Sequence, residues 1–191
     1  MKTNHLPVTV KIWSTIYHLL PDDGDDSTPA VFIGTDGEET PDVLLTSPEE
    51  KKDDDRTVKD TIHYEADGEL IFDDEKITVT YSETEEVGME NCSTTLVFDP
   101  SDPQSVVMNR TGNASAVMIF SAAEPRQHCV YQTGVADFPL DLCIRSRHVR
   151  SEMTPNGGTL FLDYVFEMRG VITERTVLKM RIVPHANPDL F

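Results

Sequence analysis

Two opposite charges stand at the ends of apolar rows in this sequence, and they are its first candidates for binding chemistry. Glu83 ends the alternating row of residues 77–81, and Arg110 ends that of residues 106–108. Because successive side chains of a strand point to opposite faces, each charge is expected on the buried face of its strand. A guanidinium in that position offers a planar pair of donors to a carboxylate or a phosphate.

Two interpretations of Glu83 and Arg110 stay open. In the first, the two side chains form the polar anchor of a ligand inside the protein or at its mouth. In the second, they form an internal ion pair that fixes the strand register, which is a common role of buried ionic groups. Both require the charges to meet, because burying either one alone would cost several kcal/mol.

Four further side chains are candidates for the same site. Tyr81 shares the row of Glu83, and Tyr131, Thr133 and Tyr164 lie in later strand patterns. Such residues line ligand cavities with an apolar body and a polar tip. Core packing with a satisfied hydroxyl is the alternative interpretation. The predicted ligand site in the lumen therefore consists of Arg110, Glu83, Tyr81, Tyr131, Thr133 and Tyr164.

Strands must position these side chains, and period-two alternation begins at residues 7–17. No segment shows a sustained helical period. Eight to ten antiparallel strands without covering helices predict an all-β, closed antiparallel barrel, because closure removes exposed edges. Further strand patterns, separated by turn residues, cover residues 57–64, 69–72, 76–83, 92–98, 105–110, 114–120, 128–133, 140–149, 159–168 and 171–183.

A long acidic segment interrupts the alternation after the first strand. Residues 21–56 hold thirteen acidic and three basic side chains. Such a composition cannot offset the entropy of ordering the chain, so we expect a mobile insertion. Residues 1–191 are accordingly expected to form one barrel domain with the insertion at 21–56 and a C-terminal tail at 184–191.

The net charge of −18 and the isoelectric point near 4.5 narrow the choice of partners. An acidic protein repels phosphate backbones, so we expect no nucleic-acid partner. No apolar run has the roughly 20 residues that a membrane span needs, and the first residues do not form a signal peptide. Cytoplasmic localisation is therefore expected. The choice between a monomer and a homodimer stays open.

The sequence contains no motif that points to a reaction. It has neither a Gly-x-Ser-x-Gly elbow nor a His-Glu-x-x-His pair, and its three cysteines show no metal-ligand spacing. We therefore expect no catalytic residue, metal or cofactor, and three reduced thiols. The late strands carry several basic residues, from Arg145 to Arg181. These are interpreted as solvated strand faces, with a contact to the acidic segment or to another subunit as the alternative.

Residues 77–182 resemble the YwiB-like bacterial proteins. The resemblance rests on Tyr-Ser-Glu at 81–83, Met-Asn-Arg-Thr-Gly at 108–112, Met-Ile-Phe at 118–120, Tyr-Gln-Thr-Gly at 131–134 and Gly-Gly-Thr-Leu at 157–160 running into Tyr164. It implies a lipocalin-like (calycin) barrel, and the family has no established activity. The acidic segment at 21–56 departs from the family layout.

The leading functional hypothesis is a non-enzymatic lipocalin-like barrel that binds a small, partly apolar or anionic ligand in its lumen. The alternative is a protein-interaction module in which a filled barrel is the scaffold and the acidic segment or the basic late strands contact the partner. An enzyme with an unrecognised site is the third hypothesis. Space in the lumen distinguishes the first two, because a ligand needs a cavity of some hundreds of Å³.

Overall fold

The computed structural model describes residues 4–19, 57–73, 75–133 and 138–185, so the predicted insertion at 21–56 lies outside the described residues. The described part consists of ten strands and one 3₁₀ turn, η1 (Glu85–Val87). The strands are β1 (Asn4–Leu19), β2 (Thr57–Phe72), β3 (Ile77–Ser82), β4 (Cys92–Asp99), β5 (Asp102–Gly112), β6 (Ser115–Ser121), β7 (Arg126–Gln132), β8 (Leu140–Thr154), β9 (Gly157–Met168) and β10 (Val171–Pro184). The expected all-β class is confirmed. Of the expected tail at 184–191, Pro184 belongs to β10, and residues 186–191 lie outside the described residues.

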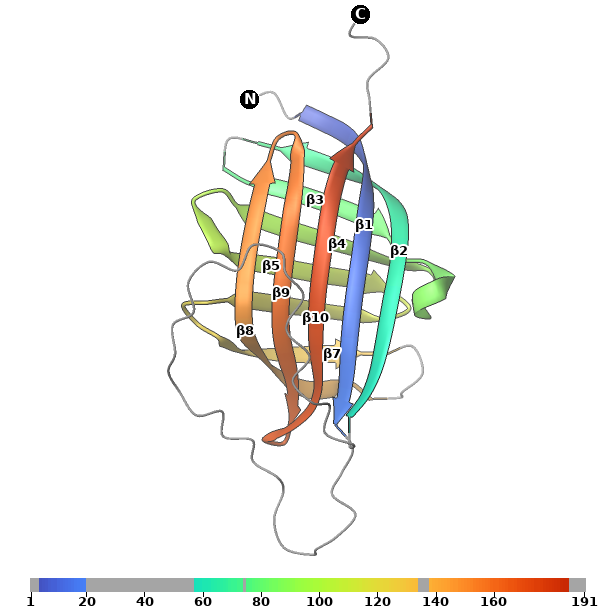
Figure 1. The fold of residues 1–191 in the computed structure, drawn as a ribbon, viewed down its shortest axis with the longest axis vertical. Coiled ribbons are helices and arrows are strands. Elements are labelled where there is room, and N and C mark those ends of the chain that lie inside the picture. The colour runs from blue at the N-terminus through green and yellow to red at the C-terminus, as the bar shows by residue number, and fades with distance from the viewer. Residues whose placement is uncertain (1–3, 20–56, 74, 134–137, 186–191) are drawn as a thin grey trace, which may run out of the picture.

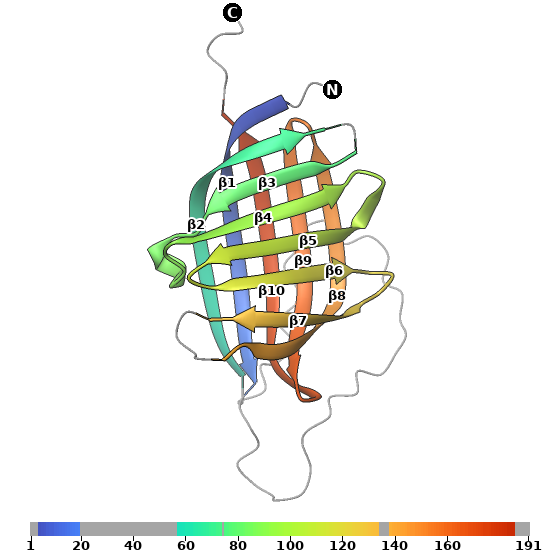
Figure 2. The same ribbon diagram turned by 180° about the vertical axis from the view of Figure 1, so that it is seen from behind.

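The strands close into a single antiparallel barrel. Each strand pairs with its neighbours in sequence, and β1 pairs with both β2 and β10, which completes the ring. Figures 1 and 2 show that the ring is flattened into two layers: the long strands β8, β9, β10, β1 and β2 run lengthwise on one side, and β3 to β7 run across them on the other. The predicted closed barrel is confirmed.

Strand β2 passes from one layer to the other, a role that bent strands have where sheets cross. It pairs with β1 along its whole length but with β3 only from Gly68 onward. A Cβ atom at Gly68 would lie 2.6 Å from the carbonyl oxygen of Thr80, so glycine permits the close approach of the two strands. The prediction of separate strands at 57–64 and 69–72 with a turn between them is therefore wrong, because Gly68 marks a bend within one strand.

The wall is weakest between β6 and β7, whose described ladder has only two residue pairs, Ser115 with Gln132 and Ala116 with Tyr131. Beyond this short ladder, the end of β6 at Ser121 contacts β8 instead of β7. The register of β8 shifts between Ser146 and His148, and the Ser146 hydroxyl accepts a hydrogen bond from the backbone N–H of Ser121 at 3.2 Å. A bulge of this kind bends a strand and redirects a side chain.

The inner side chains of all ten strands form one hydrophobic core. Several that face the barrel axis from both layers, including Val10, Leu96, Phe120, Ile144 and Leu162, are 0% exposed. A void large enough for a water molecule would expose part of its lining, so these side chains border no such void. Around these side chains the interior of the described barrel is packed.

The three cysteines are free, as expected from their spacing. Cys92 and Cys129 are buried and Cys143 is partly exposed. Among the described residues, no helix has the length and apolar character needed to cross a membrane.

Candidate functional site

One cross-strand row inside the barrel positions the predicted site. The pairing register sets Tyr81 on β3 opposite Thr94 on β4, Thr94 opposite Arg110 on β5, Arg110 opposite Ala116 on β6, and Ala116 opposite Tyr131 on β7. Directly paired side chains on one face lie about 4.5–5.5 Å apart at their Cβ atoms. Four polar side chains and one methyl group are thereby gathered from five strands.

The Glu83 carboxylate lies just beyond the end of β3 and accepts three hydrogen bonds. The hydroxyl of Tyr64 donates to Oε2 at 2.5 Å, and that of Thr94 donates to Oε1 at 2.6 Å. Arg110 Nη2 donates to the same Oε1 at 3.1 Å. The Glu83 side chain is only 1% exposed, so these donors replace the water that the carboxylate loses. The predicted meeting of Glu83 and Arg110 is seen in the structure.

Arg110 makes two more contacts along the row. Its Nε donates to the Thr94 hydroxyl at 3.3 Å and its Nη1 donates to the Tyr131 hydroxyl at 3.4 Å. Burial is the largest single influence and acts to lower the pKa of the Arg110 guanidinium, but the charge of Glu83 together with Tyr131 and Tyr81 outweighs it, so the pKa is raised. Arg110 therefore stays charged and forms an ion pair with Glu83. We call Tyr64, Glu83, Thr94, Arg110 and Tyr131 the Arg110 cluster.

The tyrosines around the cluster are held neutral. Burial, followed by the neighbouring Tyr81 and Glu83, raises the pKa of Tyr64 well above its ordinary value. Burial and Glu83 do the same for Tyr81, which is 4% exposed. These hydroxyls therefore act as hydrogen-bonding groups and not as bases at physiological pH.

The structure brings together four of the six predicted site residues, since Tyr81 and Tyr131 join Glu83 and Arg110. Tyr164 lies in the core instead: its ring packs against Phe120 and Phe166 at centroid distances of 4.8 and 5.3 Å. Burial raises the pKa of Tyr164 to about 12. Thr133 follows the end of β7 and is partly buried.

Two members of the cluster escaped the sequence prediction. Thr94 is fully buried in the same alternation as Leu96 and Phe98, so the parity of its strand could have found it. Tyr64 comes from β2 and meets Glu83 only because the barrel closes around them. No pattern along the sequence predicts the contact between Tyr64 and Glu83.

The Arg110 cluster is a charge-balanced group of hydrogen-bonding side chains. It offers one carboxylate and one guanidinium that neutralise each other, together with three hydroxyl groups. Within the described ranges, no three His, Cys, Asp or Glu side chains are grouped so that they could hold a metal ion.

A second polar feature lies outside the barrel, on the layer of long strands. The register places Arg126, Arg145, Val165, Arg175, Tyr17 and Lys59 in one row across β7, β8, β9, β10, β1 and β2. Two carboxylates beside this row order its arginines. Asp163 receives two hydrogen bonds from Arg175, at 3.0 and 2.8 Å, and Glu167 lies 2.8 Å from Arg126 and 3.5 Å from Arg145.

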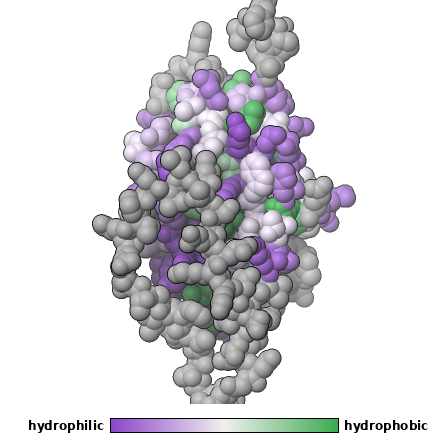
Figure 3. Space-filling model, viewed as in Figure 1, coloured by the Kyte–Doolittle hydropathy of each residue, from purple (hydrophilic) through white to green (hydrophobic). Residues whose placement is uncertain are grey.

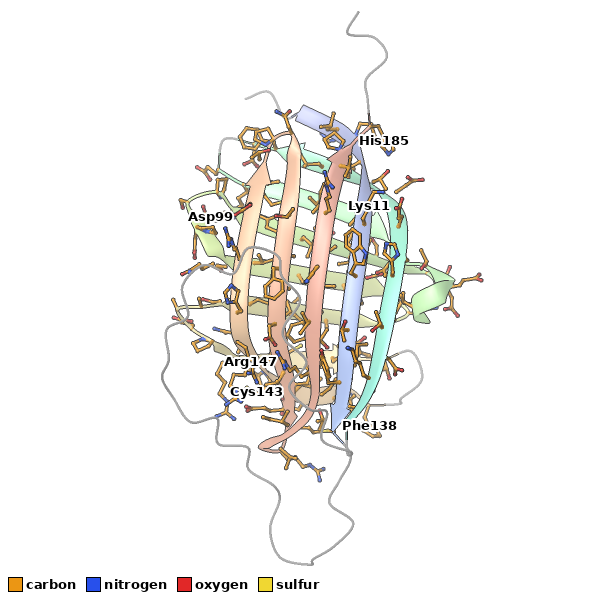
Figure 4. The ribbon with its side chains drawn as sticks, in the orientation of Figure 1. Lys11, Asp99, Phe138, Cys143, Arg147 and His185 are labelled. Atoms are coloured by element: carbon orange, nitrogen blue, oxygen red, sulfur yellow. The ribbon has the colours of Figure 1, made fainter. Side chains whose placement is uncertain are left out.

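We call the outer surface of β8, β9, β10, β1 and β2, together with Arg126, the basic face. Figure 4 labels Arg147 on β8 and Lys11 on β1, towards its two sides. The face carries more than half of the chain's 16 lysines and arginines. Its cations are Lys11, Lys59, Arg126, Arg145, Arg147, Arg150, Arg175, Lys179 and Arg181.

The fold and the two features define the class of this chain: it is a closed, lipocalin-like antiparallel barrel with a packed interior and a buried ion pair. Comparison with known proteins then gives the family. A family model described as Domain of unknown function (DUF1934) matches residues 45–180, so the chain belongs to this YwiB-like family.

One solved structure supports the same fold. It is the crystal structure of the ywiB protein from Bacillus subtilis, with a TM-score of 0.57 and 13% sequence identity over 93% of this chain and 92% of that chain. At this identity the likeness concerns the fold alone. No curated protein matches the sequence.

Proposed function

We propose that this chain is a binding protein without catalytic activity, in which the filled barrel is a scaffold for contacts with a partner protein. The observation that supports the proposal is the packed interior. Several inner side chains of both layers are 0% exposed, whereas barrels that carry small ligands keep a lumen for them. A rigid, filled barrel presents its outer strand faces in a fixed arrangement instead.

A depression on the outside of the described structure is consistent with this proposal, because it does not lead into the barrel. It has a volume of about 400 Å³ and is lined by Glu75, Lys76, Asp99, Pro100 and Ser101. These residues connect β2 to β3 and β4 to β5, at the ends of the strands opposite the Arg110 cluster. A ligand held there would contact turns and not the lumen.

Native mass spectrometry of the gently desalted protein tests the scaffold proposal. The expected spectrum contains the mass of the polypeptide alone, or a multiple of it, because the interior leaves no space for a guest. A stoichiometric small molecule that survives desalting and is released on denaturation would contradict the proposal. A saturable uptake of a fluorescent fatty acid by the folded protein would contradict it equally.

A second candidate function is the binding of a small anion at the Arg110 cluster, and one observation favours it. The Arg110 side chain is 16% exposed while that of Glu83 is 1% exposed, so the cationic partner keeps contact with the outside. Its described hydrogen bonds use three N–H groups, and a guanidinium carries five. A ligand carboxylate or phosphate would bind there, beside the Tyr131 hydroxyl that Arg110 contacts.

Titration with acetate and with inorganic phosphate tests this second candidate by the NMR shifts of the arginine side chains. The expected result is a saturable shift of the Arg110 resonance in the parent and, followed by the Tyr131 ring signals that both proteins keep, an affinity that falls about tenfold or more in Arg110→Met, equivalent to at least about 1.4 kcal/mol. Equal shifts in both proteins, or no saturable shift, would contradict an anion site.

A further inference from the structure

We infer that the partner is an acidic protein segment and that it docks on the basic face. The inference rests on the proposed scaffold function and names the surface and the chemistry of the partner. Figure 3 looks onto this side of the molecule, where hydrophilic residues (purple) occupy much of the part that is not grey. The first supporting observation is the concentration of cations on one face of a chain whose net charge is −18.

On the described part of this face nine cations outnumber seven carboxylates (Glu65, Asp67, Glu69, Asp141, Glu152, Asp163 and Glu167), and two of these carboxylates are each shared by two arginines. Asp163 forms ion pairs with both Arg175 and Arg147, at 2.8 and 3.7 Å. Glu167 likewise serves both Arg126 and Arg145. Each carboxylate is therefore shared by two guanidiniums, which leaves a net positive charge at both places. A partner that supplies carboxylates complements this surplus.

Asp163 and Glu167 also fix the orientation of the arginines that they contact. The Asp163 and Glu167 side chains are only 14% and 9% exposed, so they are fixed in the sheet. The arginines above them keep their outer edges in solvent: the side chains of Arg126 and Arg147 are 64% and 49% exposed. An arginine that is already oriented loses less entropy when a partner binds.

Aromatic side chains lie among these cations. Trp13 stacks on His63 with ring centroids 4.9 Å apart and is itself 38% exposed. Tyr17 lies between two cations, with the Arg175 guanidinium carbon at 5.4 Å from its ring centre and Lys59 Nζ at 5.8 Å. Arginine, tryptophan and tyrosine are the residues that dominate protein–protein interfaces. The face therefore combines charge with apolar contact area.

A protein segment fits this face better than a nucleic acid does. Nucleic-acid binding depends on neutralising many phosphates in a row, and this face intersperses its cations with the exposed carboxylates of Glu65, Asp67, Glu69, Asp141 and Glu152. Lys11 is paired with Glu65 at 2.7 Å and Arg150 with Glu152 at 2.6 Å. A protein segment needs only a few carboxylates and gains apolar contacts with Trp13.

Trp13 is the only tryptophan of the chain and reports directly on this face. The experiment titrates the full chain with a fluorescein-labelled polyglutamate peptide and records both the Trp13 emission and the peptide anisotropy. The expected result is a saturable change in both signals that weakens as salt is added. The test variant is Arg147→Gln/Lys179→Gln, in which Lys179 is the cross-strand partner of Trp13.

The matched control is Lys76→Gln/Arg169→Gln, which removes the same charge from the β2–β3 and β9–β10 connections. We expect the test variant to bind polyglutamate about three- to tenfold more weakly, as loss of exposed ion pairs implies, and the control to bind as the parent does. Equal melting temperatures of both variants and the parent establish that folding is unaffected.

Three results would overturn the inference. They are no saturable signal with polyglutamate, equal weakening in the test and control variants, and tighter binding of oligothymidylate or of phosphatidylserine vesicles than of polyglutamate. None of them depends on the mass spectrum, so failure of the docking surface and failure of the scaffold function are observed separately.

Discussion

Ala116 on β6 is the cross-strand partner of both Arg110 on β5 and Tyr131 on β7. The hydrogen bond from Arg110 Nη1 to the Tyr131 hydroxyl spans the strand that Ala116 occupies. A larger side chain at this buried position would fill the path of the guanidinium. The size of residue 116 therefore determines whether the Arg110 cluster can form.

Replacing Ala116 with leucine is expected to destabilise the fold by about 1–3 kcal/mol, the usual cost of overpacking a core. Urea denaturation monitored by Trp13 fluorescence measures the loss. The control is Val117→Leu at the next residue, which points outward and is 54% exposed. Equal stability of the two variants would show that the space beside Arg110 is not filled as the structure indicates.

Arg110→Met leaves the Glu83 carboxylate buried without its cation. We expect a loss of about 3 kcal/mol or more, because breaking a buried pair leaves an uncompensated charge. In the double variant Glu83→Gln/Arg110→Met, the loss should be smaller than the sum of the two single losses, since the charge is gone. Additive losses in urea denaturation would mean that the two residues do not interact.

Alkaline pH should destabilise the protein through its buried tyrosines. The pKa of Tyr164 is about 12 in the folded state against an ordinary value of 10.0, and those of Tyr64 and Tyr81 are also raised. The folded state thus holds these protons more tightly than the unfolded state does. The stabilisation is complete below pH 10 and is lost as the pH rises through the folded-state value.

Unfolding by urea at increasing pH measures this loss, and the absorbance of tyrosinate shows which tyrosines ionise. Of the five tyrosines, the three buried ones should ionise only with unfolding. Tyr164→Phe removes one titrating group and should make the decline with pH shallower. Ionisation of all tyrosines near pH 10 in a protein that stays folded would refute the prediction.

The alternation of apolar residues was sufficient to predict the ring of strands and the inward direction of Glu83 and Arg110. Whether a residue stands at an odd or even position along its strand decides which face its side chain occupies, and this can be read without knowing the neighbouring strands. It could not identify Tyr64 as a partner of Glu83, because that contact depends on how far β2 bends around the barrel. Nor could it show that β2 continues through Gly68, since a glycine marks a turn and a bend equally well.

The basic face illustrates the same limit. The sequence shows the arginines of β8 and β10 as separate residues, which favours solvated strand faces over a shared contact surface. Lys59 and Arg126 lie far from them along the chain and join their row only through five strand pairings. Charge that is dispersed in sequence becomes a surface when the barrel closes.

The pairing of β1 with β10 has a consequence for how the chain reaches its native state. Val8 pairs with Pro184, so the contact that seals the ring joins residues separated by nearly the whole sequence. Contacts of such long range slow folding, because the entropy of closing the loop is lost before the contact forms. During synthesis, β1 cannot pair with β10 until the ribosome has released the last strand. Until then the first strand has an open edge, and the time for which this edge stays exposed sets the risk of aggregation.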